Sequence, residues 1–360
     1  MEDRDIAHWR MHNLALSRPA FDAAQDVVRW LGAVQSQDYG PAKWSAAMRT
    51  GGVSDAAVDR AFADGEILRT HVLRPTWHFV IPADIRWMLQ VTAPRVQVLN
   101  AHMYRELGLD DTVLARCNTL LVDALHGGRQ RTRQELATRL ANAGIAAKGF
   151  QLGYVLMNAE LNGIICSGAL NGKQHTYALL DERAPQTAGL TDEQALAELT
   201  VRYFTSHGPA TAKDFKAWAS LTAADVRTGL EMVAAQLEQQ TFRGLTFWFA
   251  APAAFHRASP PTVHLLQAYD EYFMGYRESR AVVDASGAAA SHIRGRGAFN
   301  GVVILDGQVA GHWRRTLRKD TVVIQTALYE PFDAAGNRAL RAAGDRHGAF
   351  LGRTATVVAA

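Results

Sequence analysis

The sequence predicts an α+β fold in which tandem winged-helix domains (helix-turn-helix plus β-wing) precede a C-terminal β-rich module. Three helices followed by a β-hairpin recur three times along the 360 residues. From Pro260 the pattern changes to strands that alternate apolar and polar residues around Asp306-Gly307, closed by a helix over 333–351. The copies share a plan without a fixed sequence period, which indicates separate domains. The expected domains are residues 1–108, 109–187, 188–258 and 259–360.

The first copy combines helical periodicity with clear helix ends. Apolar residues recur at helical spacing up to Val34, Gly40 and Pro41 break this pattern, and Ser54 is placed to cap a later helix. The expected elements, in chain order, are helices 22–34, 42–48 and 54–63, strands 67–72 and 76–81, and a helical connector 83–107 interrupted at Pro94.

Capping boxes mark helices of the second and third copies. Thr132 and Thr191 each precede, by three residues, a Glu or Gln that can return the hydrogen bond, and Thr211 opens a further helix. Hairpin turns are expected at Asn171-Gly172 and Arg243-Gly244. The expected elements are helices 113–125, 132–144 and 150–161 with strands 164–167 and 175–180, then helices 191–206, 211–219 and 222–236 with a wing over 240–249.

Composition narrows the class of protein. A chain with 48% hydrophobic and 20% charged residues is typical of soluble globular proteins, and no apolar run has the length of a signal peptide or membrane span. We therefore expect a cytoplasmic protein. Cys117 and Cys166 are too few for a disulfide framework or a four-thiolate zinc site. The net charge of +3 does not by itself indicate a polyanionic partner.

Several kinds of chemistry lack their motifs. The sequence contains no GxxxxGK[ST], GxGxxG, HExxH or CxxC pattern, so we expect neither a metal nor an organic cofactor. The polar feature that stands out is Gln35 and Gln37, one residue apart where an apolar helix is expected to end. An amide can orient a water molecule without ionising. The alternative is that both glutamines cap the helix or lie in solvent.

Five stretches resemble one family. They are VQSQD at 34–38, RTHVLRPTWHFV at 69–80, GPATAKDFKAW at 208–218, YDEYFMGYR at 269–277 and NGVVILDGQVAGHWRR at 300–315. In this order they resemble the AlkZ/YcaQ family of winged-helix DNA glycosylases, and Gln35-Ser36-Gln37 resembles the Gln-x-Gln motif of its AlkZ-like branch. The middle residue of that motif is usually apolar, whereas in this chain it is Ser36. The resemblance implies a monofunctional glycosylase for N7- or N3-alkylated purines, with some members unhooking interstrand crosslinks.

The chemistry of glutamine agrees with that substrate class. Glutamine neither titrates nor carries charge, so it cannot protonate a normal base. A purine alkylated at N7 is already cationic and leaves readily. Positioning one water beneath the anomeric carbon can then be sufficient, because positioning alone removes several kcal/mol of barrier. We expect Gln35 and Gln37 to hold that water.

The expected partner is double-stranded DNA carrying alkylated purines, bound by a nucleoid-associated monomer. By resemblance the C-terminal hairpin region enters the minor groove, which gives Arg294, Arg296, Arg314 and Arg315 as candidate contacts, and Lys213 is a further candidate for a phosphate. In the first wing, the candidates for DNA contact are Arg74 and His78. The expected pocket residues are Asp38, Tyr39 and Trp77, although Trp77 equally suits the core.

Two other functions fit the same fold. Winged helices most often belong to transcriptional regulators, which would footprint an operator and release no base. Regulators usually bind as symmetric dimers, whereas three non-identical copies in one chain suit a monomer. The other alternative is a protein-interaction scaffold, which would bind no DNA duplex at low salt.

Overall fold

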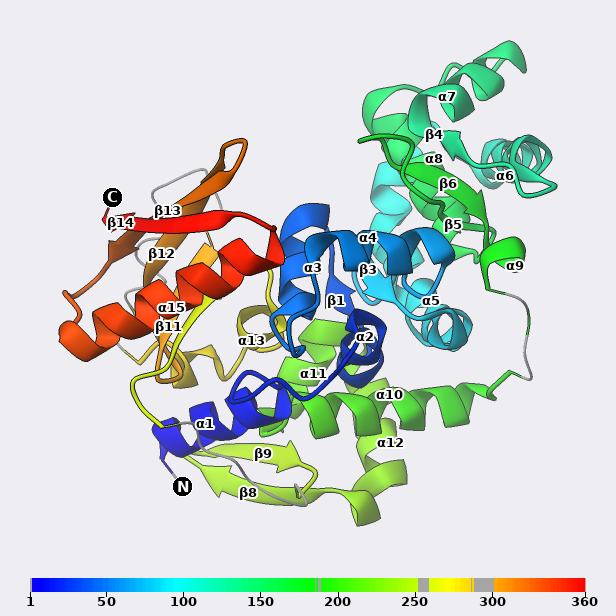
Figure 1. Ribbon diagram of the computed structural model, residues 1–360. Helices are drawn as coiled ribbons and strands as arrows, with labels where there is room; N and C mark the ends of the chain where they lie inside the picture. The colour runs from blue at the N-terminus through cyan, green and yellow to red at the C-terminus, as the bar shows by residue number, and fades with distance from the viewer. Residues whose placement is uncertain are drawn as a thin grey trace.

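The computed structural model describes residues 2–184, 186, 189–251, 259–285, 287 and 301–359. These residues form helices and four separate sheets, three of three strands and one of five (Figure 1). The α+β class is therefore confirmed. Each small sheet belongs to one of the three predicted copies, and the five-stranded sheet belongs to the C-terminal module.

The first copy follows α1 (Asp3–Asn13), a helix the sequence did not predict. Its elements are α2 (Ala24–Leu31), β1 (Val34–Gln35), α3 (Tyr39–Ala47), α4 (Asp55–Asp64), β2 (Leu68–His71), β3 (Trp77–Val80) and the connector α5 (Pro82–Glu106). The sheet order is β1-β3-β2. Ser54 caps α4 by accepting from the Ala57 N–H, as predicted.

Two helix boundaries and one helix interruption in this copy were predicted wrongly. α2 ends at Leu31, because Gly32 adopts φ 78° and Val34 then pairs with Phe79 of β3. α3 already begins at Tyr39, so Pro41 lies in the first turn, where its missing N–H costs no hydrogen bond. α5 continues through Pro94, and burial of Ala93 and Val96 on either side holds it across the lost bond.

The second and third copies repeat the order of the first. The second has α6 (Asp111–Leu125), β4 (Arg131–Thr132), α7 (Arg133–Asn142), α8 (Gly149–Leu161), β5 (Ile165–Ser167), β6 (Thr176–Leu179) and α9 (Leu180–Arg183). The third has α10 (Asp192–Ser206), β7 (Ala210–Thr211), α11 (Ala212–Ala219), α12 (Ala223–Val233), η1 (Ala234–Gln236), β8 (Glu238–Phe242) and β9 (Leu245–Phe249). The predicted capping boxes at Thr132 and Thr191 form in full.

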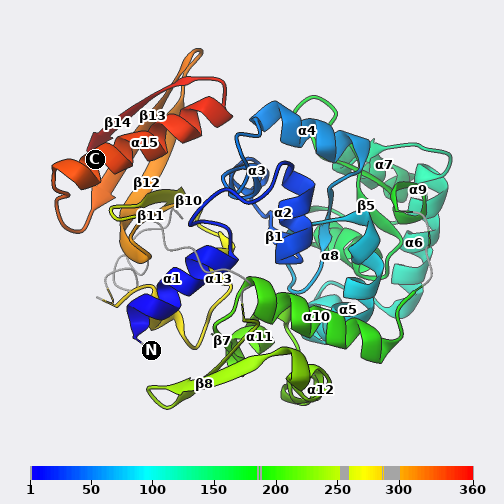
Figure 2. The same cartoon turned by 60° about the horizontal axis from the view of Figure 1, so that its bottom comes forward.

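The C-terminal module is a sheet covered by one long helix (Figure 2). Its elements are β10 (Val263–Leu266), α13 (Glu271–Met274), η2 (Arg280–Val282), β11 (Gly301–Leu305), β12 (Gln308–Leu317), β13 (Thr321–Leu328), α15 (Ala334–Phe350) and β14 (Thr354–Ala359). The meander and the closing helix were predicted. Neither edge strand was: β10 pairs antiparallel with β11, and β14 pairs parallel with β13 after the crossover through α15.

The apolar core divides the chain unequally. One continuous cluster joins the first copy, the third copy and the C-terminal module, and it also includes Leu161 and Cys166 of the second copy. Most other buried apolar residues of the second copy form a separate core that includes Leu121, Leu136 and Val155. In Figure 1 the second copy accordingly lies at the upper right, away from the C-terminal sheet. The four domain boundaries stay a prediction.

No helix among the described residues combines the length and apolarity that a membrane crossing requires.

Asp214 links the third copy to the C-terminal module. This fully buried carboxylate completes the Thr211 capping box and also accepts the backbone N–H groups of Arg277, Glu278 and Ser279 at 2.8, 2.7 and 3.1 Å. Such charge-assisted hydrogen bonds contribute more than neutral ones. The contact therefore fixes the segment after α13 against α11.

We expect Asp214→Asn to lower the free energy of unfolding by about 3 kcal/mol, because several donors then face a neutral amide in the core. The matched control is Asp225→Asn in the half-exposed capping box of α12, which should cost about 1 kcal/mol. Chemical unfolding followed by circular dichroism measures both. Equal losses would mean that the contact with residues 277–279 adds no stability.

Candidate active site

Gln35 lies in β1 opposite His78 of β3, with only 3% of its surface exposed. It therefore neither caps a helix nor lies in solvent. Its Oε1 accepts from Arg74 Nη2 at 3.0 Å, and its backbone N–H donates to Glu271 Oε1 at 3.2 Å. Its carbonyl oxygen accepts from Gln267 Nε2 at 3.3 Å. Side chains from two distant parts of the chain thus fix one amide residue in place.

Arg74 holds the Gln35 side chain, and His78 in turn contacts Arg74. Arg74 Nη1 donates to the Trp218 carbonyl at 2.7 Å, and its Nη2 lies 3.0 Å from His78 Nε2. Because a guanidinium only donates, His78 Nε2 accepts, and Nδ1 then carries the proton toward the Thr76 carbonyl at 2.9 Å. Burial and the Arg74 charge lower the pKa of His78 to about 3, so the ring is neutral. Full burial leaves His78 no surface for the expected DNA contact.

Glu271 is a fully buried anion directly behind Gln35. Its Oε2 accepts from Trp218 Nε1 at 2.8 Å and lies 3.3 Å from His207 Nε2. Burial alone would raise the pKa of this carboxyl, but the hydrogen bond from His207 and the charge of Arg74 outweigh it and lower the pKa to about 2. The site therefore keeps one fixed negative charge.

Gln37 is exposed, on the loop between β1 and α3. Arg69 holds the backbone of this loop, since its Nε donates to the Ser36 carbonyl at 3.1 Å and its Nη2 reaches the Gln37 carbonyl at 3.5 Å. The Arg69 guanidinium lies 4.4 Å from the ring centre of Trp77. Trp77 thus supports Arg69 from the first wing. Its Nε1 also donates to Glu160 at 3.2 Å, which ties the wing to the second copy.

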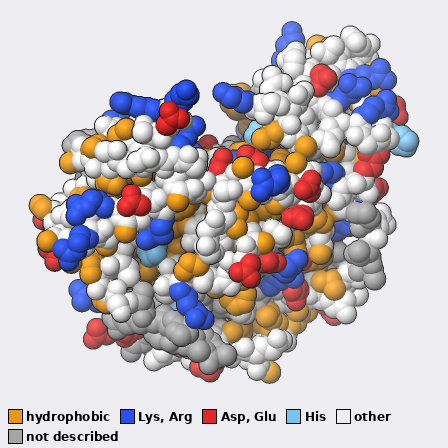
Figure 3. Space-filling view, in the orientation of Figure 1, with side chains coloured by type: hydrophobic (Ala, Val, Ile, Leu, Met, Phe, Trp, Pro, Cys, Tyr) orange, Lys and Arg blue, Asp and Glu red, His pale blue; other side chains and the backbone are white. Residues whose placement is uncertain are grey.

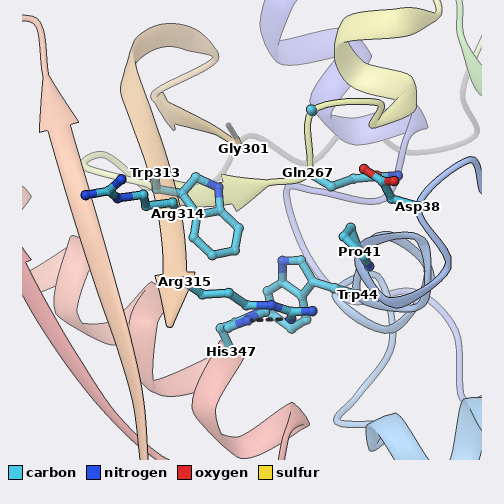
Figure 4. Close-up of a pocket in the computed structure, with 10 residues that line it drawn as sticks. Asp38, Pro41, Trp44, Gln267, Gly301, Trp313, Arg314, Arg315 and His347 are labelled. Atoms are coloured by element: carbon cyan, nitrogen blue, oxygen red, sulfur yellow. Dashed lines mark hydrogen bonds between the residues drawn. The ribbon is translucent and has the colours of Figure 1, made fainter. Parts of the chain in front are cut away.

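A cavity of about 170 Å³ opens beside the Gln-x-Gln loop, between α3, the loop after β10, β12 and α15 (Figure 4). This is smaller than a site for a drug-sized ligand. Arg315 Nη1 donates to His347 Nε2 at 3.1 Å at its base, and burial together with the Arg315 charge lowers the pKa of His347 to about 3. Residues that line the cavity include Asp38, Trp44, Gln267, Trp313, Arg314, Arg315 and His347.

The structure brings some of the predicted pocket and DNA-binding residues together. Asp38 lines the cavity, whereas Tyr39 points away from it, with its hydroxyl donating to Asp59 at 2.8 Å and its ring packed on Phe62 and Phe79. Arg314 and Arg315 border the same cavity. Arg294 and Arg296 lie outside the described residues.

Basic side chains flank a hollow next to this cavity. Figure 3 shows Lys and Arg gathered beside the hollow between the C-terminal module, at left, and the second copy, at right. On the C-terminal side, Arg314, Arg318 and Lys319 are exposed on β12 and the turn that follows it. Lys213 is also exposed, and it pairs with Glu278 at 2.6 Å.

Sequence reasoning missed the residues that fix Gln35 from behind. Glu271 and Gln267 lie more than 200 positions away in the sequence, and Trp218 belongs to the third copy. The YDEYFMGYR motif was the available signal. It contains Glu271, whose Oε1 accepts a hydrogen bond from the Gln35 backbone N–H.

Among the described residues, no group of three or more His, Cys, Asp or Glu side chains is arranged to hold a metal ion.

The buried histidines predict acid sensitivity. His78 has a pKa of about 3 in the folded protein and about 6.5 when unfolded, so the unfolded chain binds more protons as the pH falls below 6.5. Stability should fall by about 1.4 kcal/mol per pH unit for this residue between those values. We expect His78→Asn to reduce the difference in unfolding free energy between pH 7 and pH 5. The exposed His102→Asn is the control and should retain the wild-type difference; equal differences in all three proteins would refute the assignment.

Comparisons with known proteins agree on one family. The family described as DNA glycosylase AlkZ-like matches residues 28–350. An interstrand DNA cross-link repair glycosylase from Streptomyces sahachiroi is 27% identical over 346 residues, which is 91% of this chain and 90% of the relative. The solved structure of Streptomyces sahachiroi DNA glycosylase AlkZ matches 99% of this chain and 100% of its own, with a TM-score of 0.82 and 22% identity.

Proposed function

The chain belongs to the AlkZ-like family of DNA glycosylases, and from this premise we propose that it hydrolyses the N-glycosidic bond of N7- or N3-alkylated purines in duplex DNA. The observation that carries the proposal is the fixed amide of Gln35, whose Oε1 is bonded to Arg74 while no described residue accepts a hydrogen bond from its Nε2. An amide held in this way can bind a water molecule as donor and, through the second lone pair of Oε1, as acceptor.

The proposed reaction needs little from the protein beyond position and charge. An alkylated purine leaves as a neutral base once the glycosidic bond breaks, so no general acid is required. Gln35 and Gln37 would hold the water that attacks the anomeric carbon. The buried Glu271 carboxylate, behind Gln35, would favour the positive charge that develops on the sugar.

Interstrand crosslinks fit the same chemistry. The relative from Streptomyces sahachiroi is named for cross-link repair. A crosslink between two alkylated purines is unhooked when one glycosidic bond is hydrolysed. We propose that this chain acts on such lesions as well.

The proposed DNA contacts are basic. Arg314 and Arg315 border the cavity beside the Gln-x-Gln loop, Arg74 reaches Gln35 itself, and Lys213 is exposed on α11. Arg294 and Arg296 complete the proposed set. Phosphate contacts from this set would let one chain act on the nucleoid as a monomer.

We expect Gln35→Ala and Gln37→Ala each to slow release of N7-methylguanine from a duplex by about a hundredfold, because the attacking water loses one of its two partners. Heat-labile abasic sites measure the release, and gel shifts with the same duplex test whether binding is retained. The control is Gln236→Ala, an exposed glutamine on η1. Full rates in both active-site variants would contradict the assignment, and an operator footprint without base release would favour a regulator.

Chelation provides an independent check. Release should persist at its full rate in EDTA, since the proposed water is held by amides and no metal-binding cluster occurs among the described residues. Loss of activity in EDTA, with recovery on adding a divalent cation, would contradict the mechanism.

A further inference from the structure

Gln267 carries a buried acceptor that the mechanism above leaves unused. The side chain follows β10, is 3% exposed and donates from Nε2 to the Gln35 carbonyl at 3.3 Å. Because a carbonyl can only accept, this contact fixes which end of the amide is nitrogen. The oxygen, Oε1, then has no hydrogen-bond partner among the described residues. Buried acceptors without a donor are rare and indicate that a donor arrives from elsewhere.

The position of Gln267 points to the ligand that brings this donor. It lines the cavity beside the Gln-x-Gln loop together with Asp38, Trp44 and Trp313, so a group that enters the cavity contacts this residue (Figure 4). Two indole side chains in the wall suit a flat heteroaromatic ring. In the view of Figure 4 the Gln267 side chain extends from the loop after β10 toward Asp38.

The chemistry of DNA selects one donor. Gln267 is one hydrogen bond from the backbone of Gln35, the residue proposed to hold water at the anomeric carbon. The purine edge next to that carbon is the minor-groove edge, whether or not the base leaves the stack. On that edge adenine presents only acceptors, and the single donor is the N2 amine of guanine.

We infer that Gln267 is a specificity-determining residue, whose Oε1 accepts a hydrogen bond from the N2 amine of an alkylated guanine in this cavity. The inference rests on the proposed function and names the base that the site prefers. Alkylated guanine gains a contact that alkylated adenine and alkylated hypoxanthine lack. Those two bases leave Oε1 unpartnered, and the enzyme should release them less efficiently.

The test compares two bases that differ only in the N2 amine. One duplex carries a single N7-methylguanine and the other a single N7-methylhypoxanthine, and kcat/KM for base release is measured with wild type, Gln267→Met and the control Gln236→Met. Gln267→Met should lower the value for guanine about fivefold to tenfold more than the value for hypoxanthine. Gln236→Met should change neither value, because Gln236 lies on η1 and lines no part of the cavity.

Using both bases separates recognition from damage to the site. If Gln267→Met slows both bases equally, the residue only positions Gln35 and the inference is overturned. Wild-type release of both bases with no difference between variants also overturns it, while the proposed function stands. Release of neither base by wild type would overturn the proposed function itself.

A second measurement needs no variant and remains informative if Gln267→Met does not fold. Free 7-methylguanine and 7-methylhypoxanthine are added as product inhibitors of the wild-type enzyme. The inference requires 7-methylguanine to inhibit about fivefold more tightly. Equal inhibition constants would count against a contact with the N2 amine.

Discussion

The arrangement of the site depends on charge compensation around two adjacent buried carboxylates, Asp270 and Glu271. Both are completely buried at the start of α13. Arg49 binds Asp270 through two hydrogen bonds of 2.7 and 2.9 Å, and Glu271 is bonded by the Trp218 indole and the Gln35 backbone. Removing one partner of a buried ion pair typically destabilises a protein by about 3–5 kcal/mol, because an unpaired charge is left in the core. The two acids therefore hold the C-terminal module in one position against the first and third copies.

The same electrostatics limit which chemistry the site can perform. The pKa is about 3 for His78 and His347 and about 2 for Glu271, so none of the three changes its charge near neutral pH. Gln35 does not titrate at all. A general acid works best with a pKa near the working pH, and these four groups offer none. These four groups therefore suit a substrate whose leaving group needs no proton, such as the proposed N7-alkylated purine.

Local signals predicted most of the fold, and long-range pairing accounts for what they missed. Ser54, the threonine capping boxes and the Asn171-Gly172 and Arg243-Gly244 turns act within four residues, so the helices and wings could be located from sequence. The strands β1, β10 and β14 exist only because distant strands offer partners. The apolar spacing that extends to Val34 resembles a continuing helix until its pairing with Phe79 is known. For the same reason the sequence could identify Gln35 but not Glu271 or Gln267 behind it.

The second copy is coupled to the site although most of its core is separate. Its Glu160 binds His71 and the Trp77 indole of the first wing. Its Ser167 hydroxyl oxygen accepts a hydrogen bond from the backbone N–H of Arg69 at 2.8 Å.

Arg69 lies on Trp77 and donates to the carbonyls of Ser36 and Gln37. A short chain of contacts therefore runs from the second copy to the backbone that carries the Gln-x-Gln motif. Within it, the Glu160 carboxylate partly compensates the positive charge of Arg69, and Arg69 holds the loop through the carbonyls of Ser36 and Gln37. The second copy thus contributes to the geometry of the candidate site, although none of its described residues lines the cavity beside the Gln-x-Gln loop. These contacts, together with Leu161 and Cys166 in the main apolar cluster, fix the second copy to the first wing.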